Sequence, residues 1–403
     1  MNIVLIVNGI AGITAARTLR ENNPKISISI YTTEDHMYYP RPRLYELLSG
    51  EAKPNEIYAF SHKWYKNRDF QIHLNNGVVK IHTSRKELLL EDHSKVHYDK
   101  LLLANGAHPF IPPINGIDKK GIFTLRSIKN VLAIKEYATS VRTVIIIGGG
   151  LLGLEFAVAL RKLGLQVKIV EISPRLLPRQ LDHDGSKILK ELIEAYGIKI
   201  YLGVKTTEIL GKKEVSGILL DNGKVLSCNF LLISAGIRAN IDLALKAGIN
   251  VNRGVIVDKY MQTSVNDVYA AGDVAEFEGR IYGIIPAAIN QGKIAAMNML
   301  GNNKYIYKGT IPSTLLKIVG IDLMSMGITN LEGSQYEEIK KIDKERGIYK
   351  KIVLNQEKII GAIILGDKKD LTSIRRLINQ ELDVSKYKEL LLEDNFDYGT
   401  LFT

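Results

Sequence analysis

Cysteine is almost absent from this 403-residue sequence, which contains only Cys228. Disulfide bonds within the chain are therefore impossible, and metal sites held by several thiolates are excluded. Cys228 follows an apparent strand, so we expect it to be packed in the core rather than to act as a nucleophile. The eight histidines show no ligand spacing, and no metal site is expected.

Long hydrophobic runs are also missing. No apolar run reaches the roughly 18 residues that span a bilayer, and the N-terminus enters a strand directly, without the basic and apolar segments of a signal peptide. We therefore expect a cytoplasmic protein that does not associate with membranes. The hydrophobic content of 46% and the length are typical of a globular protein with two or three domains.

Acidic residues are fewer than basic ones, 43 against 54, and the net charge is +11. Residues from Gly301 onward carry 16 Lys and Arg against 15 Asp and Glu, so nearly all of the excess lies in the first 300 residues. A basic surface can attract an acidic protein, nucleic acid or anionic lipid, but a solvated lysine-rich surface explains it equally well. Aromatic and basic residues are not interleaved as in a nucleic-acid groove, so no nucleic-acid partner is expected.

The stretch Val144–Glu171 has the pattern of a dinucleotide-binding unit. A β-branched run with no polar face predicts a strand buried in a parallel sheet, a G-x-G-x-x-G turn follows, and then come a helix and a second buried strand that ends in Glu171. This complete order is far more specific than the glycines alone. We therefore expect a dinucleotide with its pyrophosphate at the start of the helix.

Each residue of this turn has a physical role. Gly148 allows a tight turn out of the strand, Gly150 leaves room for a pyrophosphate to approach the backbone, and Gly153 lets the helix pack close to the strands. Glu171 can hydrogen-bond both hydroxyls of the adenosine ribose and repel a 2′-phosphate. This arrangement favours NADH over NADPH.

The N-terminus repeats the pattern with one departure. A buried strand leads into a turn that keeps Gly9 and Gly12, and Glu34, after the second strand, is the candidate ribose acid. Val7 occupies the first glycine position. A β-branched residue is costly there if the turn needs a positive φ, and tolerable if the backbone stays in the β region.

Further segments extend this first unit. Tyr39–Leu47 combines aromatics, prolines and two arginines, and suits a rigid wall over a flat ligand, with Arg41 or Arg43 facing phosphate or carboxylate; a surface loop is the alternative. The alternating pattern of Phe70–His97 predicts antiparallel hairpins. A later strand ends in Ala-Gly-Asp, which places Asp273 where it can grip a polyol.

The chain carries an internal duplication, because the glycine turns and the closing strands recur at similar spacing. The predicted fold class is α/β, with two tandem Rossmann-like dinucleotide-binding domains, the second inserted in the first, plus a small α+β C-terminal domain. The expected ranges are 1–110 with 239–306, then 111–238, then 307–403. Two such folds imply two dinucleotides.

The order of the two fingerprints, the A-N-G-A and A-G-I turns and the later V-Y-A-A-G-D resembles the FAD-dependent pyridine nucleotide disulfide oxidoreductase superfamily, over roughly residues 1 to 305. Within it the chain is similar to the cysteine-free NADH:rubredoxin oxidoreductases and to the flavin domain of NADH-dependent nitrite reductases, through Tyr39–Leu44, Pro174–Asp182 and Pro286–Lys293. The redox-active cysteines of other members would fall at about residues 40 to 50, where this chain has none.

The resemblance implies FAD in the first unit and NADH in the second. The residues expected at FAD are Gly9, Ile10, Ala11, Gly12, Glu34, Arg41, Val79, Ala104, Asn105, Gly106, Gly272, Asp273 and Ala287. Those expected at NADH are Gly148, Gly150, Leu151, Leu152, Gly153, Glu171 and Gly236. Glu155 matches the family glutamate near the flavin N5, and because Glu46 stands where its partner lysine is expected, Arg43 is the suggested substitute. Val7, Asn105 for threonine and Ala239 for proline depart from the family pattern.

The function implied is an electron-transfer flavoprotein that passes electrons from NADH through FAD to a small acidic one-electron carrier such as a rubredoxin, which a basic surface would steer. Two other enzymatic interpretations stay open: an NADH oxidase that forms hydrogen peroxide, and an NADH-dependent electron supplier to a nitrite reductase. An interpretation from another class is a flavoprotein whose redox state controls binding to a partner.

Overall fold

The computed structural model describes residues 1–301, 304–318, 320–330, 336–366, 371–393 and 395–402. The chain divides into two compact units, each built from two separate segments. Unit 1 consists of Met1–Phe110 and Ile237–Thr310, and unit 2 of Ile111–Gly236 and Ile311–Thr403. The finer division into three domains stays a prediction. Among the described residues, no helix is both long and apolar enough to cross a membrane.

Unit 1 is built on a five-stranded sheet in which every neighbouring pair is parallel. The strand order is β19-β7-β1-β2-β3, and the strands are β1 (Asn2–Ile6), β2 (Ser27–Tyr31), β3 (Phe70–His73), β7 (Lys100–Leu103) and β19 (Val268–Ala270). The central strand β1 is buried through Ile3, Val4 and Leu5, as expected for a strand that is covered on both faces. This confirms the predicted α/β class for the first unit.

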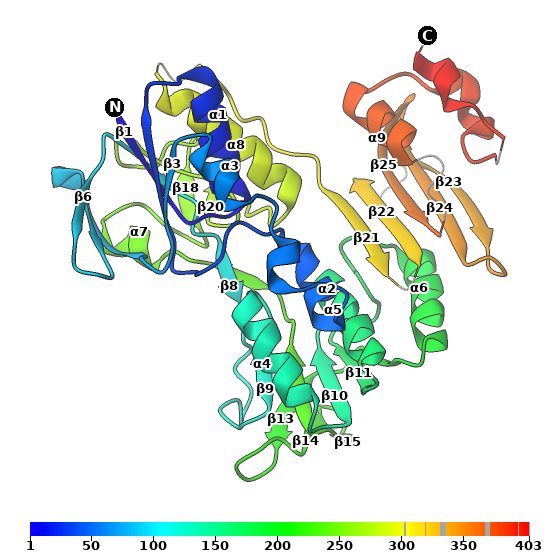
Figure 1. Cartoon of the computed structure of the whole chain (residues 1–403). Coiled ribbons are helices and arrows are strands. Elements are labelled where there is room, and N and C mark those ends of the chain that lie inside the picture. Colours follow the sequence, from blue (N-terminus) through cyan, green and yellow to red (C-terminus); the bar gives the residue numbers. More distant parts are fainter. Residues whose placement is uncertain (302–303, 319, 331–335, 367–370, 394, 403) are drawn as a thin grey trace. The chain divides into compact units, whose positions relative to one another are not determined.

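Two helices of unit 1, α1 (Ile10–Asn22) and α8 (Ile285–Met299), lie side by side in Figure 1. Their backbones approach closely, and Gly292 allows this approach: a Cβ at this position would lie only 2.6 Å from the carbonyl oxygen of Ala11. The remaining helical segments of this unit are α2 (Leu44–Ser49), α3 (His62–Lys66), α7 (Asp242–Lys246), and the 3₁₀ turns Arg41–Arg43, Pro54–Ile57 and Thr83–Arg85.

The segment Phe70–His97 corrects one prediction. Its first strand, β3, pairs in parallel with β2 and belongs to the main sheet. Only the later strands β4 (Val78–His82), β5 (Glu87–Leu90) and β6 (Lys95–His97) form an antiparallel sheet. The pattern misled because β3 is the edge strand, and an edge strand with partly exposed residues shows the same alternation as an antiparallel hairpin.

The first part of unit 2 repeats the architecture of unit 1. Its parallel sheet has the order β12-β11-β10-β16-β9, with β9 (Ile122–Thr124), β10 (Thr143–Ile147), β11 (Gln166–Glu171), β12 (Lys199–Leu202) and β16 (Phe230–Ile233). Helices α4 (Ile128–Ala138), α5 (Leu151–Lys162) and α6 (His183–Ala195) accompany it, and β13 (Thr206–Leu210), β14 (Gly217–Leu220) and β15 (Val225–Ser227) form a small antiparallel sheet. Cys228 is buried in the core beside this sheet, and burial raises the pKa of its thiol to about 11.

The C-terminal part of unit 2 is a five-stranded antiparallel sheet in the order β21-β22-β25-β24-β23. Its strands are β21 (Ser313–Ile318), β22 (Ile321–Gly327), β23 (Tyr336–Asp343), β24 (Ile348–Asn355) and β25 (Lys358–Leu365). Helix α9 (Leu371–Gln380) lies beside this sheet in Figure 1. Its Ile374, Leu377 and Ile378 belong to the same hydrophobic cluster as buried residues of the sheet. The 3₁₀ turns Ser385–Leu390 and Tyr398–Phe402 follow. The predicted α+β character of this region is confirmed.

A buried polar cluster joins this C-terminal sheet to α6. Asp182 caps the helix by accepting a hydrogen bond from the Gly185 N–H at 3.0 Å. The same carboxylate accepts from the Tyr349 hydroxyl and from Lys351 Nζ at 3.1 Å. The Lys351 side chain is only 2% exposed, and its Nζ also lies 2.6 Å from Glu338 Oε1. The cluster therefore fixes the two parts of unit 2 to each other.

Two short strands mark where the chain leaves unit 1 and returns. β8 (Ala107–Pro109) pairs antiparallel with β17 (Ile237–Ala239). Beside them Asn105 Nδ2 donates to the carbonyl of Asn240 at 2.8 Å, and Asn240 Nδ2 donates to the carbonyl of Asn105 at 2.6 Å. Asn105 thus uses its amide to hold the crossover together. A further parallel pair in unit 1 is formed by β18 (Val255–Val257) and β20 (Ala275–Phe277).

Candidate functional site

Each unit has a glycine turn where the central strand of its parallel sheet ends. In unit 1 the turn follows β1 and leads to α1, and in unit 2 it follows β10 and leads to α5. Gly9 and Gly150 cap these helices in extended conformation, and neither helix has a side-chain cap. The first backbone N–H groups of both helices are thus left for an anion, which is the usual place of a dinucleotide pyrophosphate.

In unit 2 the three fingerprint glycines have separate roles. Gly148 has a φ of +114°, and a Cβ there would lie 2.3 Å from the carbonyl oxygen of Ser234. A Cβ at Gly153 would lie 2.1 Å from the carbonyl oxygen of Gly148. By contrast, nothing lies within 4 Å of a Cβ at Gly150. Packing therefore requires Gly148 and Gly153, whereas Gly150 leaves the open space that a pyrophosphate needs.

This difference predicts opposite effects for two alanine substitutions. Gly150→Ala should leave thermal stability nearly unchanged but raise the Kd for NADH about 10-fold, roughly 1.4 kcal/mol, because the new methyl group fills the open space. Gly153→Ala should instead destabilise unit 2 by about 1–3 kcal/mol, because the methyl group overlaps the Gly148 carbonyl. Calorimetric titration with NADH and thermal unfolding separate the two, and equal losses of stability would contradict the assignment.

Glu171 lies at the end of β11, buried beside the turn. Its Oε2 accepts from the Gly149 N–H at 2.6 Å, and its Oε1 accepts from the Ser173 N–H at 2.8 Å. These two bonds fix the carboxylate at the turn, and each oxygen keeps a lone pair for a ribose hydroxyl. Leu151 and Leu152 lie in the first turn of α5, and Gly236 follows β16. The structure thus brings the predicted NADH residues to one edge of the sheet, while their binding roles stay predictions.

In unit 1, Val7 adopts the costly alternative. Its φ is +79°, in a region that β-branched residues rarely occupy, and its N–H donates to the Tyr31 carbonyl at 2.8 Å. A Cβ at Gly12 would lie 2.5 Å from the carbonyl oxygen of Val7, so the turn and α1 pack closely, as predicted. Strain of this kind persists only when surrounding contacts hold the backbone in place, and it is frequent at binding sites.

The strain at Val7 can be measured with two substitutions. Val7→Gly should be more stable than Val7→Ala by about 1 kcal/mol, the reverse of the usual order, because glycine accepts a positive φ without strain. Both variants lose the same packing of the valine side chain, so the comparison isolates the backbone. Urea denaturation followed by the fluorescence of Trp64, the chain's single tryptophan, reports on unit 1. If the alanine variant proves more stable, Val7 is not strained.

The other predicted FAD residues of unit 1 mostly lie at the same edge of its sheet. Ala104, Asn105 and Gly106 follow β7, Gly272 and Asp273 follow β19, and Ile10, Ala11 and Ala287 lie in the first turns of α1 and α8. The Gly272 N–H donates to Gln291 Oε1 at 2.8 Å. Val79 is the exception, since it lies on β4 with its side chain 47% exposed.

Three buried amide atoms at this edge have no hydrogen-bond partner among the described residues. They are Asn8 Nδ2, in the turn after β1, Asn105 Oδ1, after β7, and Gln291 Nε2, on α8. Buried polar atoms are almost always paired, so such atoms indicate a ligand with polar groups. The hydroxyls and diphosphate of FAD fit this edge. Asn8 was not among the predicted residues, although a polar residue within the fingerprint is a usable indication.

Glu34 and Arg41, both predicted to contact FAD, are bonded to each other. The Arg41 guanidinium donates to the Glu34 carboxylate and to the Tyr39 hydroxyl, and Tyr39 in turn donates to Glu34. Arg41 also lies over the Tyr39 ring, 4.6 Å from its centroid. The three side chains form a cluster in which the arginine neutralises the carboxylate, and contact of either residue with the cofactor stays a prediction.

The two residues predicted to be catalytic belong to different units. Arg43, in unit 1, makes a bidentate contact with Glu46, with nitrogen to oxygen distances of 2.7 and 3.0 Å, and donates to the Glu56 carbonyl at 2.9 Å. Glu155 lies on α5 of unit 2, and burial raises its pKa to about 7. A carboxyl with this pKa can hold or release a proton at neutral pH. The pairing of Glu155 with Arg43 stays a prediction.

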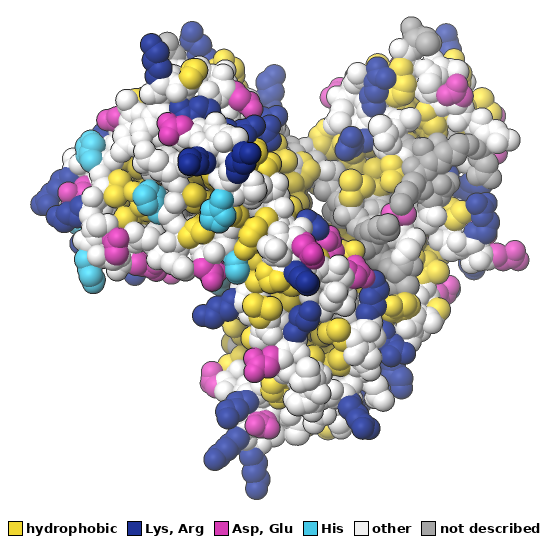
Figure 2. Space-filling view, in the orientation of Figure 1, with side chains coloured by type: hydrophobic (Ala, Val, Ile, Leu, Met, Phe, Trp, Pro, Cys, Tyr) yellow, Lys and Arg dark blue, Asp and Glu magenta, His cyan; other side chains and the backbone are white. Residues whose placement is uncertain are grey.

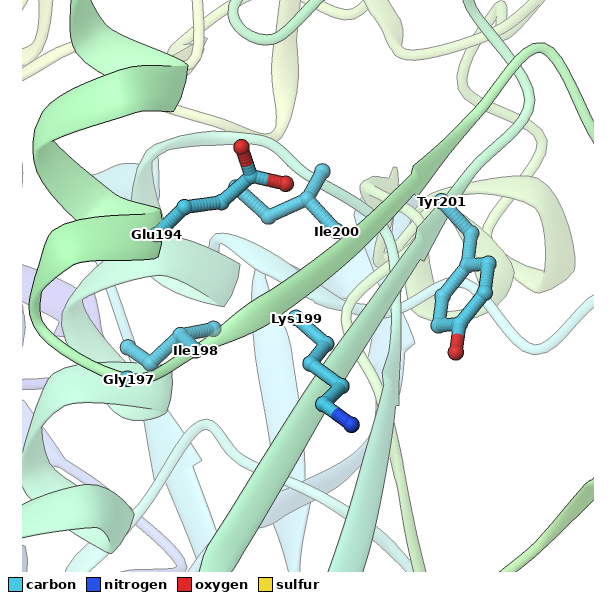
Figure 3. Close-up of a pocket in the computed structure, with 6 residues that line it drawn as sticks. All are labelled: Glu194, Gly197, Ile198, Lys199, Ile200 and Tyr201. Carbon is cyan, nitrogen blue, oxygen red and sulfur yellow. The ribbon is translucent and has the colours of Figure 1, made fainter.

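A surface hollow of about 360 Å³ lies on unit 2 over the edge strand β12. Its lining residues are Glu194, Gly197, Ile198, Lys199, Ile200 and Tyr201. In Figure 3, Lys199 and Tyr201 extend to one side of the strand while Glu194 lies on the other, so their polar groups do not converge. No predicted cofactor residue lines this hollow.

Comparison with known proteins identifies the family of the chain. A family model for pyridine nucleotide-disulphide oxidoreductases matches residues 1–292, and one for the rubredoxin NAD+ reductase C-terminal domain matches residues 312–382. The chain is 30% identical over 378 residues to an NADH-rubredoxin oxidoreductase from Clostridium acetobutylicum, covering 94% of each chain. It is 35% identical over 389 residues to a nitrite reductase [NAD(P)H] from Bacillus subtilis, covering 96% of this chain but only 48% of that relative.

Among solved structures, a ferredoxin reductase from Rhodopseudomonas palustris superposes with a TM-score of 0.89 at 25% identity, covering 99% of both chains. The match extends over both units of the chain, which confirms the predicted fold class. The chain therefore belongs to the pyridine nucleotide-disulphide oxidoreductase family.

Proposed function

We propose that this protein oxidises NADH and delivers the electrons to a small acidic one-electron carrier such as a rubredoxin. The observation that carries the proposal is a pair of dinucleotide turns in a chain whose one cysteine is buried in the core of unit 2. No cysteine is therefore placed to pass electrons from a flavin to a disulfide substrate. Similarity to an NADH-rubredoxin oxidoreductase over nearly its whole length supports the same conclusion.

Each unit binds one of the two dinucleotides. Unit 2 holds NADH through the open space at Gly150 and the oriented carboxylate of Glu171. Unit 1 holds FAD at the turn around Gly9 and beside Asp273. Bound FAD supplies the redox chemistry, since it accepts a hydride from NADH and can release the electrons singly. Buried, neutral Cys228 takes no part.

Charge supports an acidic partner. The chain carries a net charge of +11, and Figure 2 shows Lys and Arg side chains spread over the visible faces of both units, with fewer Asp and Glu between them. Complementary charge accelerates the encounter of two proteins and is screened by salt. We therefore expect electron transfer to an acidic carrier to slow markedly as ionic strength rises.

The test is stopped-flow mixing of the NADH-reduced protein with rubredoxin and, separately, with air-saturated buffer. Reoxidation by rubredoxin should be much faster than by oxygen and should slow between low and high salt. A neutral dye acceptor provides the control, since its rate should not depend on salt. Oxygen reacting as fast as rubredoxin would support a peroxide-forming oxidase instead, and no turnover with any acceptor would support a redox-controlled binding protein.

A second candidate is electron supply to a separate nitrite-reducing subunit. It is favoured by the 35% identity to a nitrite reductase of which this chain spans about half the length. The same reduced protein, mixed with a nitrite-reducing subunit that lacks its own NADH-binding part, would then be reoxidised faster than with rubredoxin. Slower reoxidation by that subunit would leave the rubredoxin-like carrier as the acceptor.

A further inference from the structure

Asn8 lies in the middle of the unit 1 glycine turn and is 8% exposed. Its Oδ1 accepts a hydrogen bond from the Tyr65 hydroxyl at 3.0 Å. That hydroxyl accepts in turn from the backbone N–H of Tyr38 at 3.3 Å. Tyr65 itself is buried, and burial raises its pKa to about 12, so the hydroxyl keeps its proton at neutral pH.

This chain of bonds fixes which way the Asn8 amide faces. The Tyr65 hydroxyl accepts from the Tyr38 N–H and donates its one proton to the amide oxygen of Asn8. The other branch of the amide is then Nδ2, a donor that is buried and has no partner among the described residues. Burying an unpaired donor is unfavourable, so the turn holds a donor meant for a group outside the chain.

The backbone around Asn8 points to the nature of that group. Val7, directly before it, is held at a positive φ, and Gly9, directly after it, caps α1 without a side-chain bond. A Cβ at Gly9 would meet nothing closer than the Ala104 carbonyl oxygen at 4.0 Å. The unpaired amide thus lies beside open space and free helix N–H groups, where an anionic oxygen is favoured.

We propose that Asn8 Nδ2 donates a hydrogen bond to a diphosphate oxygen of FAD, and that Tyr65 positions this amide. The inference rests on FAD binding in unit 1 and adds a side-chain contact to the backbone contacts of the glycine turn. Tyr65 acts only through Asn8 and is a positioning residue. The strained backbone at Val7 and the bond from Tyr65 together hold the donor in place before the cofactor arrives.

Asn8→Asp is the sharpest substitution, because it keeps the oxygen that accepts from Tyr65 and replaces the donor with a negatively charged oxygen, which repels the diphosphate. On the full-length apoprotein, the Kd for FAD should rise about 10- to 100-fold, as expected for losing a hydrogen bond to a charged group. ADP, which contains the diphosphate without the flavin, should lose affinity by a similar factor in competition with FAD. Tyr65→Phe should give a smaller loss, about 3- to 10-fold, because the donor remains but is less well oriented.

Asn22→Asp is the matched control. This substitution makes the same chemical change at the far end of α1, away from the turn. It should alter neither affinity. Phosphorus NMR of bound FAD adds a readout that a structural role would not move: the diphosphate resonances should shift in the Asn8 and Tyr65 variants and stay in place in the control.

Three results would overturn the proposal. Asn8→Asp binding FAD like the native chain would exclude the contact, and lower thermal stability with unchanged Kd would make the amide structural. Weaker binding of FAD but not of ADP would place the contact on the flavin half of the cofactor. If instead the native apoprotein takes up no FAD at all, the proposed function fails, and this outcome is distinct from the others because it does not depend on Asn8.

Discussion

Asp182→Ala is expected to destabilise unit 2 by about 3–5 kcal/mol, a value typical of removing one partner from a buried ion pair. The substitution leaves Lys351, 2% exposed, without one of its two carboxylate partners, removes the acceptor of the Tyr349 hydroxyl, and takes the cap from α6. Urea denaturation followed by circular dichroism should show an earlier transition. The Trp64 fluorescence transition, which reports on unit 1, should not move.

Asp184→Ala is the matched control, two residues further along the same helix. Asp184 is 49% exposed, and among the residues that the structure describes its one ion-pair partner is the partly exposed Lys340, so its removal should cost less than about 1 kcal/mol. Equal effects of the two alanine substitutions would show that burial of Lys351 does not matter.

The same cluster predicts a pH dependence. Burial alone raises the pKa of Asp182, but hydrogen bonds from Tyr349 and the Gly185 N–H, together with Lys351, outweigh burial and hold the pKa below its usual value. A carboxylate with a lowered pKa contributes stability that is complete above its unfolded pKa and is lost as the pH falls through its folded pKa. The difference in stability between the native chain and Asp182→Ala should therefore shrink in acid.

Glu155→Gln is expected to slow reduction of the bound flavin by NADH about 100-fold at mildly acidic pH, the range typical of losing a general acid. Burial raises the pKa of Glu155 to about 7, so the carboxyl carries a proton below that pH. If Glu155 lies at the flavin, as the resemblance implies, it would supply the one proton that the flavin takes up, besides the hydride, when it is fully reduced. The native rate should fall as the pH rises through 7. Glutamine has the same size but cannot donate a proton, so flavin reduction in the Glu155→Gln variant should be slow and independent of pH.

Stopped-flow absorbance of the flavin across the pH range measures this rate. Stability gives an independent check, because a carboxyl with a raised pKa contributes stability that is present below pH 4.5 and lost as the pH rises through 7. Glu155→Gln should therefore melt at a higher temperature than the native chain in alkaline buffer. A glutamine variant as fast as the native protein in mild acid would show that the proton of Glu155 is not used.

Local causes explain which features could be predicted from sequence. The β10–α5–β11 unit depends on neighbouring residues: a β-branched run, glycines that sterics require, and an acid at the strand end. The strain at Val7 could only be framed as two alternatives, because its φ is set by tertiary contacts such as the bond to the Tyr31 carbonyl. Its cost could be stated in advance, but not which alternative holds.

Long-range partners explain what could not be predicted. Tyr65 orients Asn8 from 57 residues away, and no local pattern connects the two. Glu34 and Arg41 were each expected to meet the ligand, yet they bond to one another, because opposite charges seven residues apart meet once the intervening turn forms. β3 was mistaken for part of a hairpin since its edge position gives it the alternation of an antiparallel strand.

The crossover through β8 and β17 has a consequence for how the chain is made. The last strand of the unit 1 sheet, β19, pairs with β7 and is synthesised only after the whole of residues 111–236. On the ribosome, the inserted fold can therefore become complete while β7 still has a bare edge, and bare edges invite pairing with other chains. Nascent protein at this stage should depend on chaperones, and its yield should fall when translation pauses before Ala270.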